Sequence, residues 1–194
     1  MSRVGECARL TRETRIQASI NLDGSGSADV KTGLGFLDHM LENLARHSGF
    51  DIELQCLGDL NVDDHHTAED CAIALGSALD EALGDRAGIT RFGAQYAPLD
   101  ESLCRVVVDL CGRAWSEVHL DLKRERIGEW ATENITHFFR TLSASSRSTI
   151  HVDVLRGDND HHKVEASFKA LAVALRQATT ARGQGVPSTK GVLG

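Results

Sequence analysis

Two copies of one short motif, each at the expected start of a helix, constrain the fold of this chain more than any other feature. The motif reads D-H-H-x-x-E and occupies residues 64–69 and 160–165. Apolar residues follow each copy at intervals of three and four, which is the spacing of a helix that buries one face. An Asp or Asn just before each copy is a helix N-cap signal. Each motif is therefore predicted to form the first turn of a partly buried helix.

The two adjacent histidines of the motif must point in different directions, because neighbouring helical residues are about 100° apart. Glu69 lies between them in angle, four residues after His65 and three after His66. Such a triplet can give one imidazole to each of two metal ions. The alternative is a pair of solvent-exposed histidines at a helix start. Two copies at matching helix starts favour the metal interpretation.

Composition limits the class of protein. The 194 residues carry a net charge of −7 and have ordinary globular proportions, with 41% apolar and 25% charged residues. No Lys/Arg cluster stands out, so neither nucleic acid nor a membrane is expected as a partner. We find no signal peptide and no apolar segment long enough to span a bilayer. The five cysteines are odd in number and lack C-x-x-C pairing, which indicates reduced thiols in a cytoplasmic protein.

The predicted elements occur twice in the same order. Before the join near 84–88 we expect two or three strands within 1–34, a helix at 36–47, a strand at 50–57 and the first motif helix, which ends near 84. After the join we expect strands at 91–98, 102–110, 113–122 and 149–155, and helices at 134–145 and 161–182. His39 precedes His65 by 26 residues, and His137 precedes His161 by 24. This repetition indicates an internal duplication.

The duplication predicts an α/β (α+β) fold of two similar halves, each a small mixed sheet backed by two helices. We expect half-repeats at 1–86 and 87–182 and a tail at 183–194, all in one compact domain. The tail has little helix or strand character, and its glycines favour mobility when it is free.

The repeated pattern supplies eight candidate metal ligands. They are His39, His65, His66, Glu69, His137, His161, His162 and Glu165. Divided equally, they give three imidazoles and one carboxylate to each ion, a set that leaves the metal open. Positions left for substrate and water favour catalysis over a structural role. Asp38, Asp64 and Asp160 could orient ligand imidazoles, although helix capping is an equally good interpretation for Asp64 and Asp160.

Five segments together resemble the imidazoleglycerol-phosphate dehydratase family of histidine biosynthesis. They are residues 36–41, 63–70, 133–139, 161–165 and 187–193, and the resemblance covers essentially the whole chain. It implies a tandem half-domain of the ribosomal protein S5 domain 2-like type, two Mn²⁺ per active site and a homo-oligomer of 24 subunits with sites between subunits. The phosphatase domain fused to some members is not expected here. Thr189 and Ala114 replace a usual Ser and Pro, and neither change removes a charged or metal-binding group.

The resemblance also assigns roles by position. Glu13, His47, Glu69 and Glu165 match catalytic positions, and Glu13 and His47 match substrate-contacting ones. The phosphate-binding positions match Arg91, Arg113, Lys169, Ser188, Thr189 and Lys190. Arg forks, Lys charges and hydroxyls suit a phosphate dianion, but without the resemblance each cation would be interpreted as a solvated surface charge. We expect the tail to close over the bound phosphate.

The implied reaction converts D-erythro-imidazole glycerol phosphate to imidazole acetol phosphate. No carbonyl acidifies the C–H bond that must break, so the ring has to accept the electrons, as an imidazolate or diazafulvene-like intermediate stabilised by a dinuclear metal site. Glu13 and a metal-bound water are candidates for proton transfer. Two other classes remain open from the residues alone. A dinuclear hydrolase would usually carry more bridging carboxylates, and a non-catalytic metal-storing shell would not need the phosphate-type cations.

Overall fold

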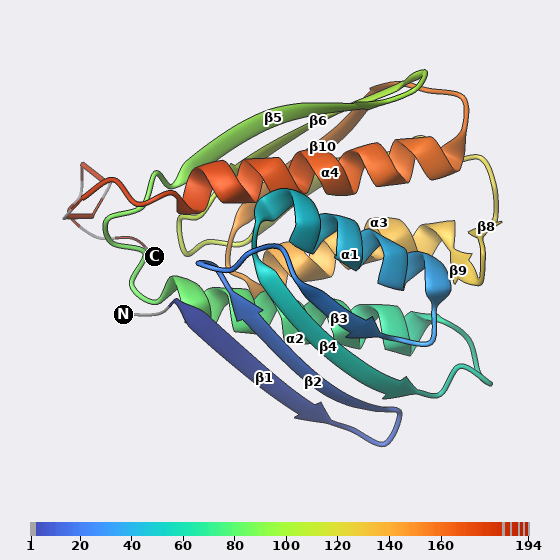
Figure 1. Cartoon of the computed structure of the whole chain (residues 1–194). Helices are drawn as coiled ribbons and strands as arrows, with labels where there is room; N and C mark the ends of the chain where they lie inside the picture. Colours follow the sequence, from blue (N-terminus) through green and yellow to red (C-terminus); the bar gives the residue numbers. More distant parts are fainter. Residues whose placement is uncertain (1–2, 184, 187, 190, 192, 194) are drawn as a thin grey trace.

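Two mixed sheets enclose a layer of helices in this protein (Figure 1). The structure is a computed structural model that describes residues 3–183, 185, 186, 188, 189, 191 and 193. The first half contains β1 (Val4–Leu10), β2 (Thr14–Asn21), β3 (Ala28–Lys31), α1 (Gly35–Ser48), β4 (Asp51–Gly58) and α2 (His65–Leu83). The second half contains β5 (Phe92–Leu99), β6 (Ser102–Asp109), β7 (Trp115–His119), β8 (Arg126–Ile127), β9 (Trp130–Ala131), α3 (Thr132–Ser145), β10 (Thr149–Arg156) and α4 (Asp160–Thr179).

The two halves share one topology. Their sheets have the strand orders β1-β2-β4-β3 and β5-β6-β10-β7. In each sheet the first three strands pair antiparallel, and the last strand pairs parallel to its neighbour. The predicted α/β fold of two similar halves with small mixed sheets is thereby confirmed.

The layer of helices brings elements of the two halves together. Helix α2 packs on β1 and β2, and α4 packs on β5 and β6. Within the layer, α1 lies beside α4 and α3 lies beside α2, so each neighbouring pair combines both halves (Figure 1). A buried aromatic cluster of Trp130, Phe138, Phe139 and Phe168 connects β9, α3 and α4. Removing these large apolar side chains from water stabilises the contact between the helices.

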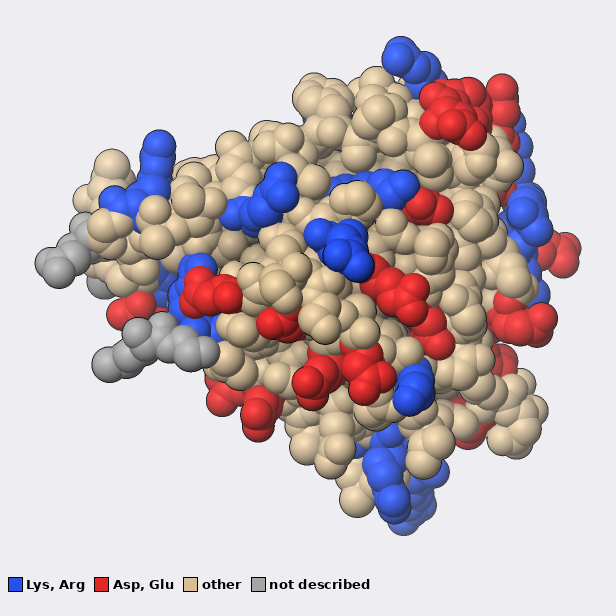
Figure 2. Space-filling view, in the orientation of Figure 1, with Lys and Arg blue, Asp and Glu red and all other residues tan. Residues whose placement is uncertain are grey.

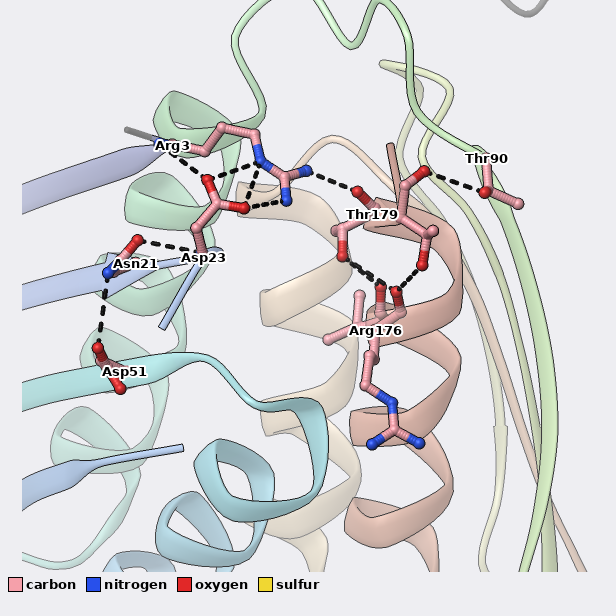
Figure 3. A network of polar contacts seen from close by, with 9 residues as sticks. Arg3, Asn21, Asp23, Asp51, Thr90, Arg176 and Thr179 are labelled. Carbon is pink, nitrogen blue, oxygen red and sulfur yellow. Dashed lines mark hydrogen bonds and ion pairs between the residues drawn. The ribbon is translucent and has the colours of Figure 1, made fainter. Parts of the chain in front are cut away.

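Polar contacts join the two halves at the far end of α4. Arg3 pairs with Asp23 and donates from Nη1 to the Thr179 carbonyl at 2.6 Å. Figure 3 shows this side chain reaching from the start of β1 to the last turn of α4. Within the second half, the Thr90 hydroxyl donates to the Thr180 carbonyl at 3.0 Å. These bonds satisfy carbonyls that the end of a helix leaves without intrahelical partners.

The structure differs from the sequence prediction at the ends of some elements and in one hairpin. Strand β7 covers Trp115–His119, within the predicted 113–122. Helix α4 ends at Thr179, three residues before the predicted end, where the Thr179 and Thr180 hydroxyls donate to carbonyls of the last turn. The hairpin of β8 and β9 was not predicted, because strands of two residues are too short to display a period. None of the helices in the described part of the chain is long and apolar enough to cross a membrane.

Candidate metal centre and substrate site

The helix layer brings six of the eight candidate ligands into two clusters. One, here the Glu69 cluster, contains His65, Glu69 and His137. The other, the Glu165 cluster, contains His39, His161 and Glu165. Within each cluster the potential ligand atoms lie within 4.8 Å of one another. Two imidazoles and one carboxylate form a donor set that fits a divalent transition-metal ion, with positions left for further ligands.

The carboxylate is the centre of each cluster. In the Glu69 cluster, His137 Nε2 lies 2.8 Å from Glu69 Oε1, and the rings of His65 and His137 stack with centroids 5.0 Å apart. In the Glu165 cluster, Glu165 Oε2 lies 3.1 Å from His161 Nε2 and 3.3 Å from His39 Nε2. These contacts place nitrogen and oxygen donors around a common point in each cluster.

Each cluster combines both halves of the chain. His39 of α1 joins the second motif, and His137 of α3 joins the first motif. The cause is the packing of α1 against α4 and of α3 against α2. The order of residues along the chain left this pairing open.

The second histidine of each motif lies outside the cluster, as the helical angle requires. His66 Nδ1 lies 3.0 Å from Asp59 Oδ2, and its Nε2 lies 3.7 Å from Glu13 Oε1. The bond to Asp59 raises the pKa of His66. His162 Nδ1 lies 2.7 Å from Glu101 Oε2, and this bond raises the pKa of His162. Neither imidazole therefore belongs to the cluster on its own helix, and each contacts a carboxylate instead.

Glu13 and Glu101 occupy the same place in the two halves, directly before β2 and β6, but their surroundings differ. Glu101 accepts hydrogen bonds from the backbone N–H groups of Asp158 and Asn159 at 3.1 and 2.9 Å. Bonding to His162 and to these backbone groups holds the pKa of Glu101 well below its usual range. The carboxylate of Glu13 is half exposed, and the nearest partner that the described residues offer it is His66 at 3.7 Å.

The three acidic residues expected to orient imidazoles have other direct partners. Asp38 accepts from the backbone and hydroxyl of Thr32, at 2.8 and 2.6 Å. Asp160 accepts from the backbone N–H groups of residues 123 and 124, both at 2.7 Å. Asp64 is buried and accepts from Asn134, whose other amide atom contacts His65.

The helix-capping interpretation of Asp64 and Asp160 also needs correction. The side chains that accept from the first-turn N–H groups are those of Asp63 and Asn159, one residue earlier in each case, at 2.9 Å. Asp64 instead accepts hydrogen bonds from the start of α3, and Asp160 accepts from the loop at residues 123–124.

One basic side chain contacts the Glu165 cluster, and others act on nearby His47. Lys169 Nζ lies 2.6 Å from Glu165 Oε1, one helical turn along α4. The pKa of His47 is lowered by desolvation and by the positive charge of Lys169, with smaller effects of Arg176 and Arg46. Figure 2 shows Lys and Arg side chains over this part of the surface, along α1 and α4. The positive charge is suited to holding a phosphate near His47.

Two other expected phosphate-binding residues, Arg91 and Arg113, lie elsewhere. Arg91 makes two hydrogen bonds with Asp109, at 2.7 and 2.9 Å. Its backbone N–H donates to Ala178 at the last turn of α4, roughly 26 Å along the helix from His161. Arg113 is exposed in the loop between β6 and β7. Ser188 and Thr189 belong to the described part of the tail, and Lys190 lies outside the described residues.

Sequence reasoning missed five residues whose side chains contact candidate ligands. Asn43 contacts His39 and Thr141 contacts His137, each from one turn further along the same helix. Asp59 contacts His66, Glu101 contacts His162, and Asn134 contacts His65. The internal repeat contained a signal for Glu101, because it precedes β6 as Glu13 precedes β2. No sequence signal marked Asn134, whose contact joins residues 69 positions apart.

Comparison with known proteins gives one consistent family. The family described as imidazoleglycerol-phosphate dehydratase matches residues 32–175. A protein of that name from Candida glabrata is 53% identical over 95% of this chain and 97% of its own length. Another from Phytophthora nicotianae is 58% identical over 98% of this chain, which spans 42% of that longer relative. The crystal structure of the Staphylococcus aureus imidazoleglycerol-phosphate dehydratase is 38% identical, with a TM-score of 0.83, over 92% of this chain and 99% of that one.

Proposed function

Because this chain belongs to the imidazoleglycerol-phosphate dehydratase family and is therefore a dehydratase of histidine biosynthesis, we propose that it converts D-erythro-imidazole glycerol phosphate to imidazole acetol phosphate at a dinuclear site. The observation that carries this proposal is the convergence of two His₂Glu clusters across the halves. When bound, two divalent ions, which we propose to be Mn²⁺, would stabilise negative charge on the substrate's imidazole ring. The enzyme is proposed to act in the cytoplasm.

The remaining ligands are proposed to come from other copies of the chain. Each cluster holds three donors, whereas His66 and His162 face away from the cluster on their own helix. Arg91 lies beside the last turn of α4, too far from the Glu165 cluster at the first turn to reach a substrate held there in its own subunit. Sites shared between subunits would bring these groups together, in agreement with the 24-subunit assembly that the family resemblance implies.

Glu13 is the best-placed group for proton transfer in this proposal. Its counterpart Glu101 is held by His162 and two backbone N–H groups, but the Glu13 carboxylate is half exposed and lies 3.7 Å from His66 Nε2. A carboxylate without strong partners can take up and release a proton during the reaction. Glu69 and Glu165 would hold the ions and so act on the reacting ring indirectly.

The phosphate of the substrate is proposed to lie beside His47 and Lys169. Lys169 adds positive charge next to the Glu165 cluster, and an ammonium group binds phosphate as a point charge. Arg91 and Arg113 would complete the phosphate site from neighbouring copies. We propose that the tail of residues 183–194, with Ser188, Thr189 and Lys190, closes over the bound phosphate. The half-repeats 1–86 and 87–182 are proposed to form the rigid body against which the tail closes.

A direct assay tests this function. Purified protein is incubated with Mn²⁺ and imidazole glycerol phosphate, and formation of the enolisable ketone is followed. We expect His137→Ala to lower kcat/KM by about 100-fold or more, because a ligand shell that loses a member binds its ion weakly. His119→Ala is the matched control, since His119 is exposed and lies 3.7 Å from Glu117. Equal turnover by the two variants would contradict the assigned site.

A further inference from the structure

The residues behind the two clusters are different, although the clusters themselves are related by the internal repeat. Asn134 and Phe36 occupy equivalent places, each three residues before the single histidine of its helix. Asn134 contacts His65 of the Glu69 cluster, whereas Phe36 contacts His161 of the Glu165 cluster. The two halves therefore share the ligand residues, but not the residues that contact the ligand imidazoles from behind.

In the Glu69 cluster, a buried chain of hydrogen bonds fixes the orientation of one imidazole. A carboxylate accepts hydrogen bonds, and Asn134 Nδ2 donates to Asp64 Oδ2 at 3.0 Å. The Asn134 Oδ1 atom then faces His65 Nδ1, at 2.9 Å, and can only accept. His65 therefore carries its proton on Nδ1 and presents the lone pair of Nε2 to a metal. Asp64 is itself held by the backbone N–H of Ala131 at 2.7 Å.

The Glu165 cluster has no such chain among the described residues. The Phe36 ring lies 4.9 Å from the His161 ring, centroid to centroid, and a phenyl ring cannot accept the bond that Asn134 accepts. Asp160, the counterpart of Asp64, is occupied by the backbone of the loop at residues 123–124. Among the described residues, His161 thus has only Glu165 of its own cluster as a carboxylate partner, at Nε2, and no carboxylate or amide outside the cluster fixes its tautomer.

The carboxylates of the two clusters also differ, and this difference again favours metal binding at the Glu69 cluster. Lys169 Nζ lies 2.6 Å from Glu165 Oε1, so one oxygen of this carboxylate is already paired with an ammonium group. The position equivalent to Lys169 on α2 is Ile73, which brings no charge to Glu69. A divalent ion entering the Glu165 cluster meets a nearby ammonium group, and one entering the Glu69 cluster does not.

We infer that the two metal sites are unequal: the Glu69 cluster binds a divalent ion more tightly and fills first, and Asn134 is the residue that positions His65 for it. The inference rests on the proposed function, in which both clusters hold divalent ions. Removing an outer hydrogen-bond partner of a ligating histidine typically weakens metal affinity by 10–100-fold.

Metal titration of the complete chain tests the inequality without measuring turnover. Protein stripped with chelator is titrated with Mn²⁺, and free Mn²⁺ is followed by its electron paramagnetic resonance signal. We expect two classes of site whose dissociation constants differ by about 10–100-fold. His137→Ala should remove the tight class, and His39→Ala should remove the weak one. One class of equal sites, or loss of the tight class in His39→Ala, would overturn the inference.

Two further variants test the groups named as causes. Asn134→Leu should weaken the tight class by about 10-fold or more and leave the weak class unchanged; a merely structural role would weaken both or neither. If this variant does not fold, Lys169→Met supplies the independent test, because removing the ammonium group should tighten only the weak class. An unchanged difference between the classes in either folded variant contradicts the role of that residue. Absence of Mn²⁺ binding at both clusters of the parent chain would instead overturn the proposed function and this inference with it.

Discussion

Replacing Gly93 by Ala tests how closely β5 must approach the helix that carries the second motif. A Cβ atom built at Gly93 would lie 2.0 Å from the carbonyl oxygen of Ala174 in α4. The first half has the same contact, where a Cβ at Gly5 would lie 2.0 Å from the Ala78 carbonyl of α2. The obstacle in both cases is helix backbone, which cannot rotate away as a flexible side chain can.

The size of the effect follows from the geometry. Ordinary van der Waals contact begins near 3.4 Å, so α4 would have to withdraw by roughly 1.4 Å from the sheet. Overpacking of this kind typically costs about 1–3 kcal/mol of stability. For a chain of this size, that corresponds to a fall in Tm of roughly 2–12 °C. Because α4 carries His161 and Glu165, we also expect the displacement to weaken metal binding at the Glu165 cluster.

Thermal unfolding of metal-free protein, followed by circular dichroism, measures the change. Gly35→Ala is the matched control, because a Cβ at Gly35 meets no atom within 4 Å. This control should be neutral or slightly stabilising, since Ala restricts the unfolded chain more than Gly does. A Tm for Gly93→Ala equal to that of Gly35→Ala would refute the argument from close packing of α4 against β5.

Three further predictions concern proton transfer, the tail and acid stability. Glu13→Gln should lower kcat by about 100-fold or more while the bound Mn²⁺ per chain, measured by elemental analysis, stays constant; a loss of metal would instead make Glu13 a ligand. Truncation after Val186 should leave folding and metal binding intact and reduce kcat/KM, and an unchanged value in a correctly assembled sample would exclude a closing tail. Hydrogen bonding to Arg3 lowers the pKa of Asp23, so this pair stabilises the fold above about pH 4 and ceases to do so as the pH falls through the lowered value. Because Asp23 is half exposed, Asp23→Asn should cost no more than about 1 kcal/mol at pH 7 in urea unfolding, and a difference that persists at about pH 2 would contradict this assignment.

The sequence by itself determined the duplication, the α/β class and the positions of the long helices and strands. The helices and strands depend on periodicities within about twenty residues, which a single stretch of chain displays without its neighbours. The duplication depends on the recurrence of one motif, which begins at Asp64 and again at Asp160. The angular argument at His65 and His66 belongs to the same level, because the helix alone separates adjacent side chains. It anticipated that the two histidines of one motif would have different surroundings, as His65 in the Glu69 cluster and His66 beside Asp59 do.

Only the tertiary structure decided which groups meet. His39 lies 126 residues from Glu165 along the chain, and the two come together because α1 packs beside α4. The contact of His65 with Asn134 depends in the same way on α3 lying beside α2. Burial of apolar faces fixes these helix pairs, and many pairings of two similar halves would satisfy the same local patterns. The packing of the helix layer therefore decides which residues contact each imidazole. It also decides the difference between the two clusters.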